Sequence, residues 1–329
     1  MSTFRALIAE GSADRYVTHF KDLTADALPP GDLLVEVVYS SLNYKDALAV
    51  TGRGRIIRRF PMVCGIDLAG RVIATESPAF AVGDEVLVVG QGLGETDWGG
   101  YSQRACIRAE AALKLPAGLN LQQAMAIGTA GFTAMLALMA LEDYGIAAGD
   151  REMVVTGAAG GVGSIAVALL AAHGYKVAAS TGRAETHAYL RELGATTIVD
   201  RGDLAKEGPP LAQQRWAGGI DAVGGQTLAS LIASTAAYGA IAACGLAGGA
   251  EVSTTVFPFI LRNVALLGIN SVDPPKALRT RAWERLAHGA FLAKLDTIAN
   301  LEPLSAIQRL SQLILEGRIR GRVVIDANA

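Results

Sequence analysis

The stretch Thr156-Gly157-Ala158-Ala159-Gly160-Gly161-Val162-Gly163 decides the fold of this chain. The apolar run before it, Met153–Thr156, is typical of a buried strand, and Val162–His173 is typical of a helix. A glycine-rich turn between a strand and a helix leaves backbone N–H groups free at the helix start, where the helix dipole also favours an anion. The stretch therefore predicts a dinucleotide-binding turn, with an ordinary tight turn as the alternative. The residues expected to contact the cofactor here are Ala159, Gly160, Gly161 and Val162.

Strand and helix patterns alternate on both sides of this turn. The expected strands are Met153–Thr156, Lys176–Ser180, Thr196–Asp200, Gly219–Val223, Ala240–Cys244 and Val264–Ile269, and the expected helices are Ala124–Leu141, Val162–His173 and Ala184–Leu193. This alternation is typical of a parallel, doubly wound sheet with helices on both faces, the Rossmann architecture. Strands that are apolar along most of their length also fit burial on both faces of the sheet.

The first third and the last part of the chain have a different pattern. In the first third, short β-rich runs such as Leu33–Tyr39, Gly70–Ala74 and Glu85–Val89 alternate with turns, and helical spacing is sparse. Near the end, Leu304–Leu315 has apolar residues at helical spacing, and Arg322–Asp326 is typical of a short strand. We expect this tail to return to the first domain.

Length and pattern together predict two domains. A chain of 329 residues is longer than one compact core usually holds. A returning tail makes the first domain discontinuous. The predicted fold class is α/β, with a doubly wound Rossmann domain at 124–270 inserted in a mostly β domain formed by 1–123 and 271–329.

Charge and composition exclude several classes of protein. The formal net charge is −2, so no global basic field exists to hold nucleic acid. The uncharged stretches Met153–Ala172 and Ala222–Ala250 are interrupted by glycines, which argues against membrane spans. The three cysteines, Cys64, Cys106 and Cys244, are far apart and form neither a disulfide framework nor a zinc cage. We therefore expect a soluble protein of the reducing cytoplasm that acts on a small molecule.

The end of the second expected strand indicates which dinucleotide binds. It reads Ala179-Ser180-Thr181-Gly182-Arg183 and contains no acid, whereas NAD sites usually place Asp or Glu there for the ribose 2′-hydroxyl. Arg183 and the hydroxyls of Ser180 and Thr181 would instead bind a 2′-phosphate. Gly182 lies between them, and Arg201 is a weaker candidate for the adenosine side. The sequence therefore predicts NADPH. The alternative is that the hydroxyls cap the next helix and that Arg183 is solvated.

These features together resemble a known family. The order of a β domain, a glycine-rich turn, a Rossmann unit and a returning tail is similar, over essentially the whole chain, to the zinc-free medium-chain dehydrogenases/reductases, the quinone oxidoreductase group. The segments that resemble its acryloyl-CoA reductase subfamily are Ser41–Asp46, Thr51–Ile57, Gly65–Asp67, Trp98–Ser102, Cys244–Gly249 and Phe257–Val264. The resemblance implies a GroES-like catalytic domain, NADPH as cofactor and a homodimer. It also implies that Leu246, Ile260 and Ser271 lie beside the cofactor.

Zinc-dependent members of the superfamily carry Cys, His and Glu ligands in the first domain, and this chain lacks them. The position of the Cys reads Asn43 or Tyr44, and the Gly-His-Glu element reads Gly65-Ile66-Asp67. An isoleucine side chain binds no metal, and Cys64 has no second Cys or His nearby in the sequence. The sequence predicts no metal site, and Cys64 is more typical of a small buried apolar residue.

Without a metal, the expected chemistry is the reduction of an activated C=C bond rather than the oxidation of an alcohol. NADPH would deliver hydride to the β-carbon of an enone or enoyl thioester, and an acid would protonate the α-carbon. The resemblance places Tyr44 near the nicotinamide, as a proton or hydrogen-bond donor or as a wall of the pocket. A purely packed tyrosine is the alternative. Asn43 and Asp67 are further catalytic candidates, and Asp67 could act by orienting Tyr44 or Lys45.

A basic run in the first domain suggests the kind of substrate. Arg53, Arg55, Arg58 and Arg59 would suit the phosphates of a CoA thioester, although a solvated loop is the plainer interpretation. The leading hypothesis is therefore an NADPH-dependent reductase of a short enoyl-CoA such as acryloyl-CoA. The second is a quinone or small-enone reductase, which needs no phosphate-binding patch. The third is a protein in which NADPH only stabilises the fold.

Overall fold

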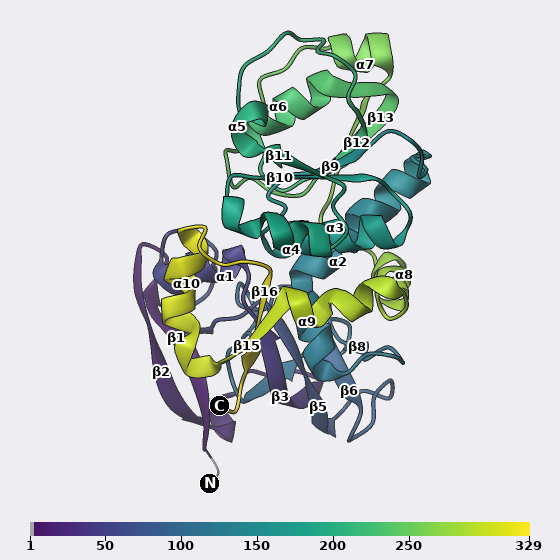
Figure 1. The fold of residues 1–329 in the computed structure, drawn as a ribbon. Coiled ribbons are helices and arrows are strands. Elements are labelled where there is room, and N and C mark those ends of the chain that lie inside the picture. Colours follow the sequence, from purple (N-terminus) through teal and green to yellow (C-terminus); the bar gives the residue numbers. More distant parts are fainter. Residues whose placement is uncertain (1–2) are drawn as a thin grey trace. The chain divides into compact units, whose positions relative to one another are not determined.

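The computed structural model describes residues 3–329 and divides them into two compact units (Figure 1). Unit 1 comprises Met1–Thr129, Val272–Ala287 and Leu295–Ala329. Unit 2 comprises Ala130–Ser271 and His288–Lys294. Unit 1 is therefore assembled from three separate segments of the chain.

Unit 2 is built on a six-stranded sheet in the order β11-β10-β9-β12-β13-β14. All five pairings are parallel. The strands are β9 (Met153–Val155), β10 (Val177–Thr181), β11 (Thr197–Asp200), β12 (Trp216–Asp221), β13 (Thr235–Ala243) and β14 (Ala265–Gly268). The order runs outward from β9 in both directions, which is the doubly wound topology of the Rossmann fold. The predicted fold class is confirmed.

Helices cover both faces of this sheet. Figure 1 shows α3 and α4 on one face and α5 and α6 on the other. The helices of unit 2 are α3 (Gly161–Ala172), α4 (His187–Glu192), α5 (Arg201–Leu204), α6 (Gly225–Ser234) and α7 (Phe257–Arg262). Because helices lie on both faces, central strand residues such as Val154 and Ile241 are fully buried.

Unit 1 is mostly β, as expected. A seven-stranded sheet has the order β15-β16-β3-β5-β6-β8, with β7 also paired to β3, and a three-stranded sheet has the order β2-β1-β4. The strands are β1 (Thr3–Ser12), β2 (Arg15–Thr24), β3 (Leu33–Ser41), β4 (Met62–Val63), β5 (Asp67–Thr75), β6 (Glu85–Val89), β7 (Arg104–Ile107), β8 (Leu113–Lys114), β15 (Ala299–Pro303) and β16 (Arg322–Asp326). The last strand, β16, pairs antiparallel with β3, so the tail closes the sheet begun in the first third.

The helices of unit 1 were less predictable than its strands. They are α1 (Tyr44–Thr51), α8 (Lys276–Leu286), α9 (Leu295–Ile298) and α10 (Ile307–Leu315). The spacing of apolar residues did not predict α1, because the helix is only two turns long. Its apolar side packs against α10 in a core that includes Leu42, Ile307 and Leu310.

Two segments expected as single helices are each split. Ala184–Leu193 forms a 3-10 turn at Ala184–Thr186 before α4, and Leu304–Leu315 forms one at Leu304–Ala306 before α10. Short 3-10 turns are common at helix N-termini, where the first N–H groups lack partners. Near the first split, the hydroxyl of Thr186 donates to the carbonyl of Arg183 (2.7 Å) and so competes with regular helix geometry.

The long helix α2 (Leu121–Tyr144) is kinked at Gly128, which has φ 51° and ψ −161°. The boundary between the two units falls one residue later, between Thr129 and Ala130. By length and composition α2 could cross a membrane, but 89% of its most apolar window is buried inside the fold. A buried core helix explains the same hydropathy, so α2 carries no argument for a membrane span.

Candidate functional site

The glycine-rich turn of unit 2 forms a cradle of backbone groups. Gly157 has φ +57°, and the N-cap residue of α3, Gly160, provides no side-chain cap. A Cβ at Gly163 would lie 2.3 Å from the carbonyl oxygen of Gly157, so only glycine fits there. The first N–H groups of a helix have no partner within the helix. The turn can therefore hold an anion at the start of α3.

Two arginines lie beside this cradle. The guanidinium of Arg183 donates from Nη2 to the carbonyl of Ala159 in the turn (3.2 Å). The side chain of Arg201 crosses Gly182, where a Cβ would lie 2.4 Å from its Nε. Gly182 is thus the residue that lets Arg201 approach the end of β10. Both guanidinium groups lie at the end of β10, the position where a Rossmann fold binds the adenosine ribose.

The hydroxyls at the end of β10 have local roles. Thr181 Oγ1 accepts from the backbone N–H of Arg183 (3.1 Å) and lies 3.2 Å from Thr186 Oγ1. Ser180 is buried, and its carbonyl accepts from the N–H of Ala158. Thr181 therefore shapes the turn that carries Arg183, but neither hydroxyl caps the 3-10 turn at Ala184–Thr186 or α4, which begin without side-chain caps. The guanidinium itself points back over the glycine-rich turn.

Three residues expected beside the cofactor have different surroundings. Leu246 and Ile260 are exposed, at 65% and 68% of their surfaces. Ser271 Oγ accepts from Thr133 Oγ1 (2.8 Å), and Thr133 is buried in α2. Sequence analysis did not single out Thr133, because a threonine inside a long apolar helix gives no local signal. The structure brings these two hydroxyls together within unit 2.

Tyr44 is the first residue of α1 in unit 1, and 45% of its surface is exposed. The two other catalytic candidates, Asn43 and Asp67, are buried. Asn43 Nδ2 donates to a carboxylate oxygen of Asp67 (2.9 Å) and to one of Asp46 (3.0 Å). Both side chains are therefore occupied by internal hydrogen bonds, whereas the Tyr44 ring is available to a ligand.

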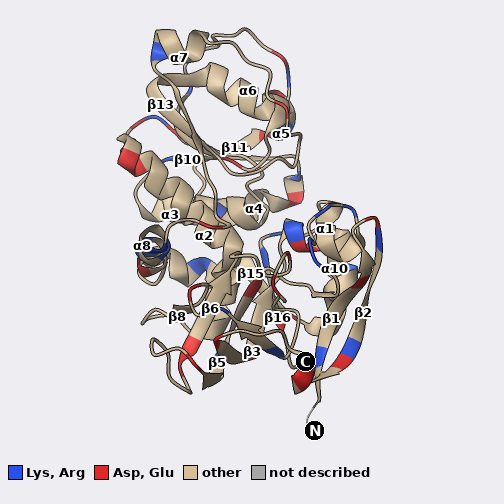
Figure 2. Cartoon of the chain, turned by 180° about the vertical axis from the view of Figure 1, so that it is seen from behind, with Lys and Arg blue, Asp and Glu red and all other residues tan. Residues whose placement is uncertain are grey.

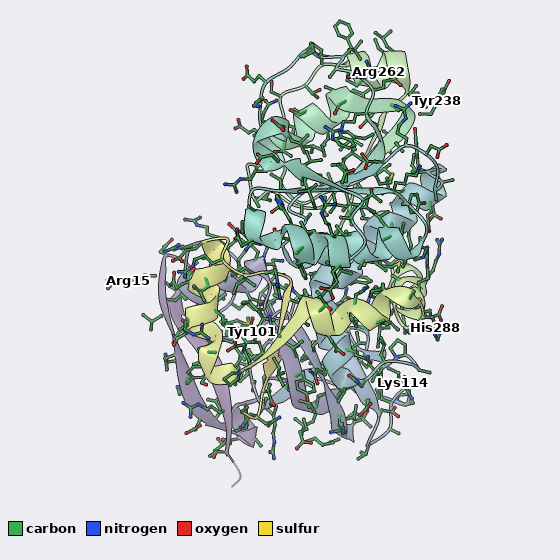
Figure 3. All side chains as sticks on the ribbon, in the orientation of Figure 1. Arg15, Tyr101, Lys114, Tyr238, Arg262 and His288 are labelled. Carbon is green, nitrogen blue, oxygen red and sulfur yellow. The ribbon has the colours of Figure 1, made fainter. Side chains whose placement is uncertain are left out.

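A buried polar network surrounds Asn43. Asp67 also accepts from Ser41 Oγ (2.5 Å) and from the backbone N–H of Thr129 (2.9 Å). The guanidinium of Arg322 donates to Asn43 Oδ1 (3.2 Å), and to the hydroxyl of Ser41 (2.8 Å). Tyr101, inside unit 1 in Figure 3, donates from its hydroxyl to the carbonyl of Ser41 (3.1 Å).

Burial shifts the ionisation of this network. Burial, and then the charge of Asp67, raises the pKa of Asp46 to about 7. Three N–H groups oppose that shift, because Asp46 accepts from the backbone N–H and Nδ2 of Asn43 and from the N–H of Ile66. Burial also lowers the pKa of Arg322, against the attraction of Asp67 and Asp46. Because two carboxyl groups share one buried guanidinium, the network is sensitive to the loss of any one of them.

The basic run of unit 1 lies on the loop that follows α1. Figure 2 shows blue stretches, which mark Lys and Arg, in the loop next to α1, and Arg53, Arg55, Arg58 and Arg59 are all exposed. Arg55 is 3.8 Å from Asp14 in a pair that is almost fully solvated, so that contact contributes little. The structure therefore leaves these guanidinium groups facing solvent.

Glu95 links the arginine loop to α1. Its carboxylate accepts from Lys45 Nζ (2.5 Å), and its backbone carbonyl accepts from the N–H of Arg58 (2.9 Å). The Glu95 side chain is only 10% exposed, so the ion pair is partly shielded from water. The positive charge of Lys45, next to Tyr44, is consequently neutralised within unit 1.

Thiols and metal ligands offer no further centre in the part of the chain that the structure describes. All three cysteines are free thiols, and burial raises the pKa of Cys64 well above its usual range and that of Cys244 to about 12. Among residues 3–329, no three His, Cys, Asp or Glu side chains are grouped so that they could hold a metal ion.

Two protein-family models match the two parts of the chain. The model for the alcohol dehydrogenase GroES-like domain matches residues 29–117. The model for zinc-binding dehydrogenases matches residues 161–288. The first match falls in unit 1, and most of the second falls in unit 2.

Several known proteins are similar over their full length. The acrylyl-CoA reductase AcuI of Ruegeria pomeroyi is 48% identical, and the match covers 99% of this chain and 100% of that protein. The putative quinone oxidoreductase YhfP of Bacillus subtilis is 44% identical, with 99% of each chain covered. The crystal structure of Escherichia coli K-12 YhdH with bound NADPH is 48% identical and superposes with a TM-score of 0.95, covering 98% of this chain and 100% of that one.

Proposed function

Because this chain belongs to the medium-chain dehydrogenase/reductase family, we propose that it is an NADPH-dependent reductase of short enoyl-CoA thioesters, converting acryloyl-CoA to propanoyl-CoA without a metal. One observation carries the cofactor assignment: two guanidinium groups, Arg183 and Arg201, stand at the end of β10, where no acid is present. A carboxylate there would repel a 2′-phosphate, and two cations bind one.

The cradle fits the cofactor for a second reason. Gly157, Gly160 and Gly163 leave the start of α3 without side chains, so a diphosphate can meet the backbone N–H groups directly. NADPH is indeed bound to the similar protein YhdH of Escherichia coli. The cofactor supplies a hydride to the β-carbon of the unsaturated substrate.

The remaining chemistry falls to side chains of this chain. Hydride addition at the β-carbon places negative charge on the thioester carbonyl oxygen, and a proton must reach the α-carbon to complete the reduction. The Tyr44 hydroxyl can donate a hydrogen bond to that oxygen or a proton to that carbon. The other two candidates, Asn43 and Asp67, are engaged in the buried network.

The arginine loop supports a CoA substrate rather than a free enone. A CoA thioester carries a diphosphate and a 3′-phosphate, which exposed guanidinium groups bind through paired hydrogen bonds. The similarity to an acrylyl-CoA reductase supports the same assignment. The similarity to a putative quinone oxidoreductase supports the second candidate, in which the acceptor is a quinone.

The deciding experiment is NADPH oxidation, followed at 340 nm, with acryloyl-CoA, crotonoyl-CoA, methyl vinyl ketone and a quinone. We expect the highest kcat/KM with acryloyl-CoA. Charge reversal by Arg55→Glu together with Arg58→Glu should raise KM for acryloyl-CoA and leave methyl vinyl ketone unchanged. A quinone that is reduced faster than every thioester, with no effect of the charge reversal, would establish the second candidate. An absence of turnover with all four acceptors would favour a purely structural use of NADPH.

We also propose a homodimer in the cytoplasm. β14 is the last strand of its sheet, and only β13 pairs with it among the described residues. Leu266 on this strand and Leu261 on α7 are large exposed apolar side chains, and Tyr238, at the edge of unit 2 in Figure 3, is another. A second copy could pair along the open edge and cover them. Light scattering should give twice the chain mass, and Leu266→Arg should give the single chain mass.

A further inference from the structure

The first turn of α1 is fixed by residues from distant parts of the chain. Asn43, its N-cap, accepts from Arg322 at Oδ1 and donates from Nδ2 to Asp46 and Asp67. The Asp46 carboxylate also accepts from the backbone N–H of Asn43 (2.9 Å), which closes half of a capping box. The N-cap amide therefore has both of its ends engaged.

Arg322 is the cation at the centre of this arrangement. It comes from β16, and only 2% of its surface is exposed. Its Nη1 donates to the carbonyl of Leu42 (2.9 Å) as well as to Asn43, and its Nε donates to the carbonyl of Ala126 (3.1 Å). The guanidinium thus holds the backbone on the N-terminal side of Tyr44.

The pairing of Arg322 with Asp67 is mediated by a hydroxyl. Ser41 Oγ accepts from Arg322 Nη2 and donates to Asp67, so the cation and the carboxylate share one bridging group. Gly128, at the kink of α2, leaves room for this bridge. A Cβ there would lie 2.5 Å from Arg322 Nη2 and 2.8 Å from both Asp67 Oδ2 and Ser41 Oγ.

Tyr44 depends on this support because its own ring is poorly packed. With 45% of the residue exposed, its position is set by the backbone at Leu42 and Asn43 more than by contacts of the ring. A displacement of about 1 Å at a reacting group can lower a rate by about a hundredfold. We propose that Arg322 is a positioning residue for the reduction, acting through Asn43 to orient Tyr44. This inference rests on the proposed function of Tyr44.

A double-mutant cycle separates positioning from general stability. Arg322→Met and Tyr44→Phe are compared singly and together, with NADPH and the best acceptor of the wild-type chain. We expect Arg322→Met to lower kcat at least about tenfold while KM for NADPH changes less than about twofold. In the Tyr44→Phe background, the same substitution should change kcat less than about twofold, because the group it positions is gone. An equal effect in both backgrounds would overturn the proposal.

A matched control and a milder variant guard against misfolding. Arg279 is also a buried arginine of unit 1, and it donates to the carbonyls of Glu110 and Ala111 without touching α1. Arg279→Met should lower the thermal midpoint and leave kcat within about twofold. Ser41→Ala removes only the bridging hydroxyl and should lower kcat in the same direction as Arg322→Met, but less. A loss of kcat in Arg279→Met as large as that in Arg322→Met would contradict the proposal.

A readout without turnover distinguishes this proposal from the proposed function. Hydrogen exchange, measured by mass spectrometry on the peptide covering residues 42–51, should accelerate in Arg322→Met and not in Arg279→Met. If the wild-type chain reduces no acceptor, the proposed function fails, while faster exchange still shows that Arg322 holds the start of α1. Unchanged exchange would show that Arg322 does not hold it, whatever the chain reduces.

Discussion

Two helices of this molecule begin in opposite ways. In unit 2, α3 begins at a turn of glycines with no side-chain cap, and its neighbouring cations lie to the side. In unit 1, α1 begins at Asn43, whose side chain and backbone are held by Asp46, Asp67 and Arg322. Both helix starts offer the same backbone donors and the same dipole.

The difference shows how one local structure serves two purposes. A helix start that has no side-chain cap can receive an anionic ligand at its free N–H groups. A helix start closed by buried side chains fixes the residue that follows it, here Tyr44. In the proposed function, capping therefore distinguishes the start of α3, which we propose binds the cofactor, from the start of α1, which supports the proposed donor Tyr44.

The open start of α3 should be the more sensitive of the two to an added methyl group. Gly163→Ala places a Cβ 2.3 Å from the carbonyl of Gly157, so the turn must shift. We expect NADPH affinity to fall at least about a hundredfold, since several backbone donors move together. Fluorescence titration of the reduced nicotinamide measures this. Gly149→Ala, where a Cβ would meet nothing within 4 Å, is the control, and an equal loss of affinity there would contradict NADPH binding at the glycine-rich turn.

The cations beside the open start should decide which dinucleotide binds. Removing Arg183 or Arg201 deletes charge-assisted hydrogen bonds, each contributing about 1.5–3 kcal/mol. Arg183→Ala should therefore raise KM for NADPH about tenfold to a hundredfold and change that for NADH little. Steady-state kinetics with both cofactors test this. Equal effects on the two would contradict the assignment of Arg183 to the 2′-phosphate.

The buried carboxyl group of Asp46, at the start of α1, should make the stability of the folded chain depend on pH. The pKa of Asp46 is about 7 in the folded chain and near 3.8 when exposed, so the folded state holds this proton more tightly. Its contribution to the free energy of unfolding therefore decreases as pH rises from about 4 to about 7, by at most about 1.4 kcal/mol per pH unit. Asp46→Asn keeps an acceptor but does not ionise.

Urea unfolding between pH 5 and pH 8 measures that contribution. The wild-type chain should lose more stability over this range than Asp46→Asn does. Asp150→Asn, at an exposed carboxylate paired with Lys176, is the control and should follow the wild-type slope in this range. Parallel slopes for the wild-type chain and Asp46→Asn would mean that Asp46 is already ionised at pH 5 in the folded chain.

A third helix start provides the smallest expected effect. At the beginning of α2, Asn120 Oδ1 accepts from the N–H of Gln123 (2.8 Å), and Gln123 Oε1 accepts from the N–H of Asn120 (3.1 Å). This exposed pair caps the helix and supports no reacting group. Asn120→Ala should cost about 1 kcal/mol of stability and leave kcat and KM unchanged. A change in kinetics would show that capping alone does not separate the two purposes.

The Rossmann unit was largely predictable because its signals are local. The glycine-rich turn, its flanking strand and the order of the following elements can all be found in one continuous segment, and β9, β10 and β11 lie within one residue of their predicted bounds. β12 begins at Trp216, three residues before the predicted start at Gly219. Gly219 pairs with Val154 inside the strand, and it must be a glycine because a Cβ there would lie 2.6 Å from the carbonyl oxygen of Val154.

The support around Tyr44 was not predictable, because its partners are distant in the sequence. Asn43 and Asp67 were named as candidates, but nothing near them points to Arg322 or Thr129. One usable signal was present: Asn43 followed three residues later by Asp46 is the pattern of a helix start. It would have revealed α1 and drawn attention to Asp46.

The returning strand has a consequence for how the molecule is made. Arg322 and Ser41 hydrogen-bond across 281 residues of chain, so the network in unit 1 cannot close until β16 has left the ribosome. All of unit 2 is synthesised before that moment and can fold first. Until then, β3 lacks its pairing with β16, and the carboxyl groups of Asp46 and Asp67 lack the guanidinium of Arg322. We therefore expect nascent chains to be most prone to misassembly in the N-terminal segment of unit 1, which is synthesised first.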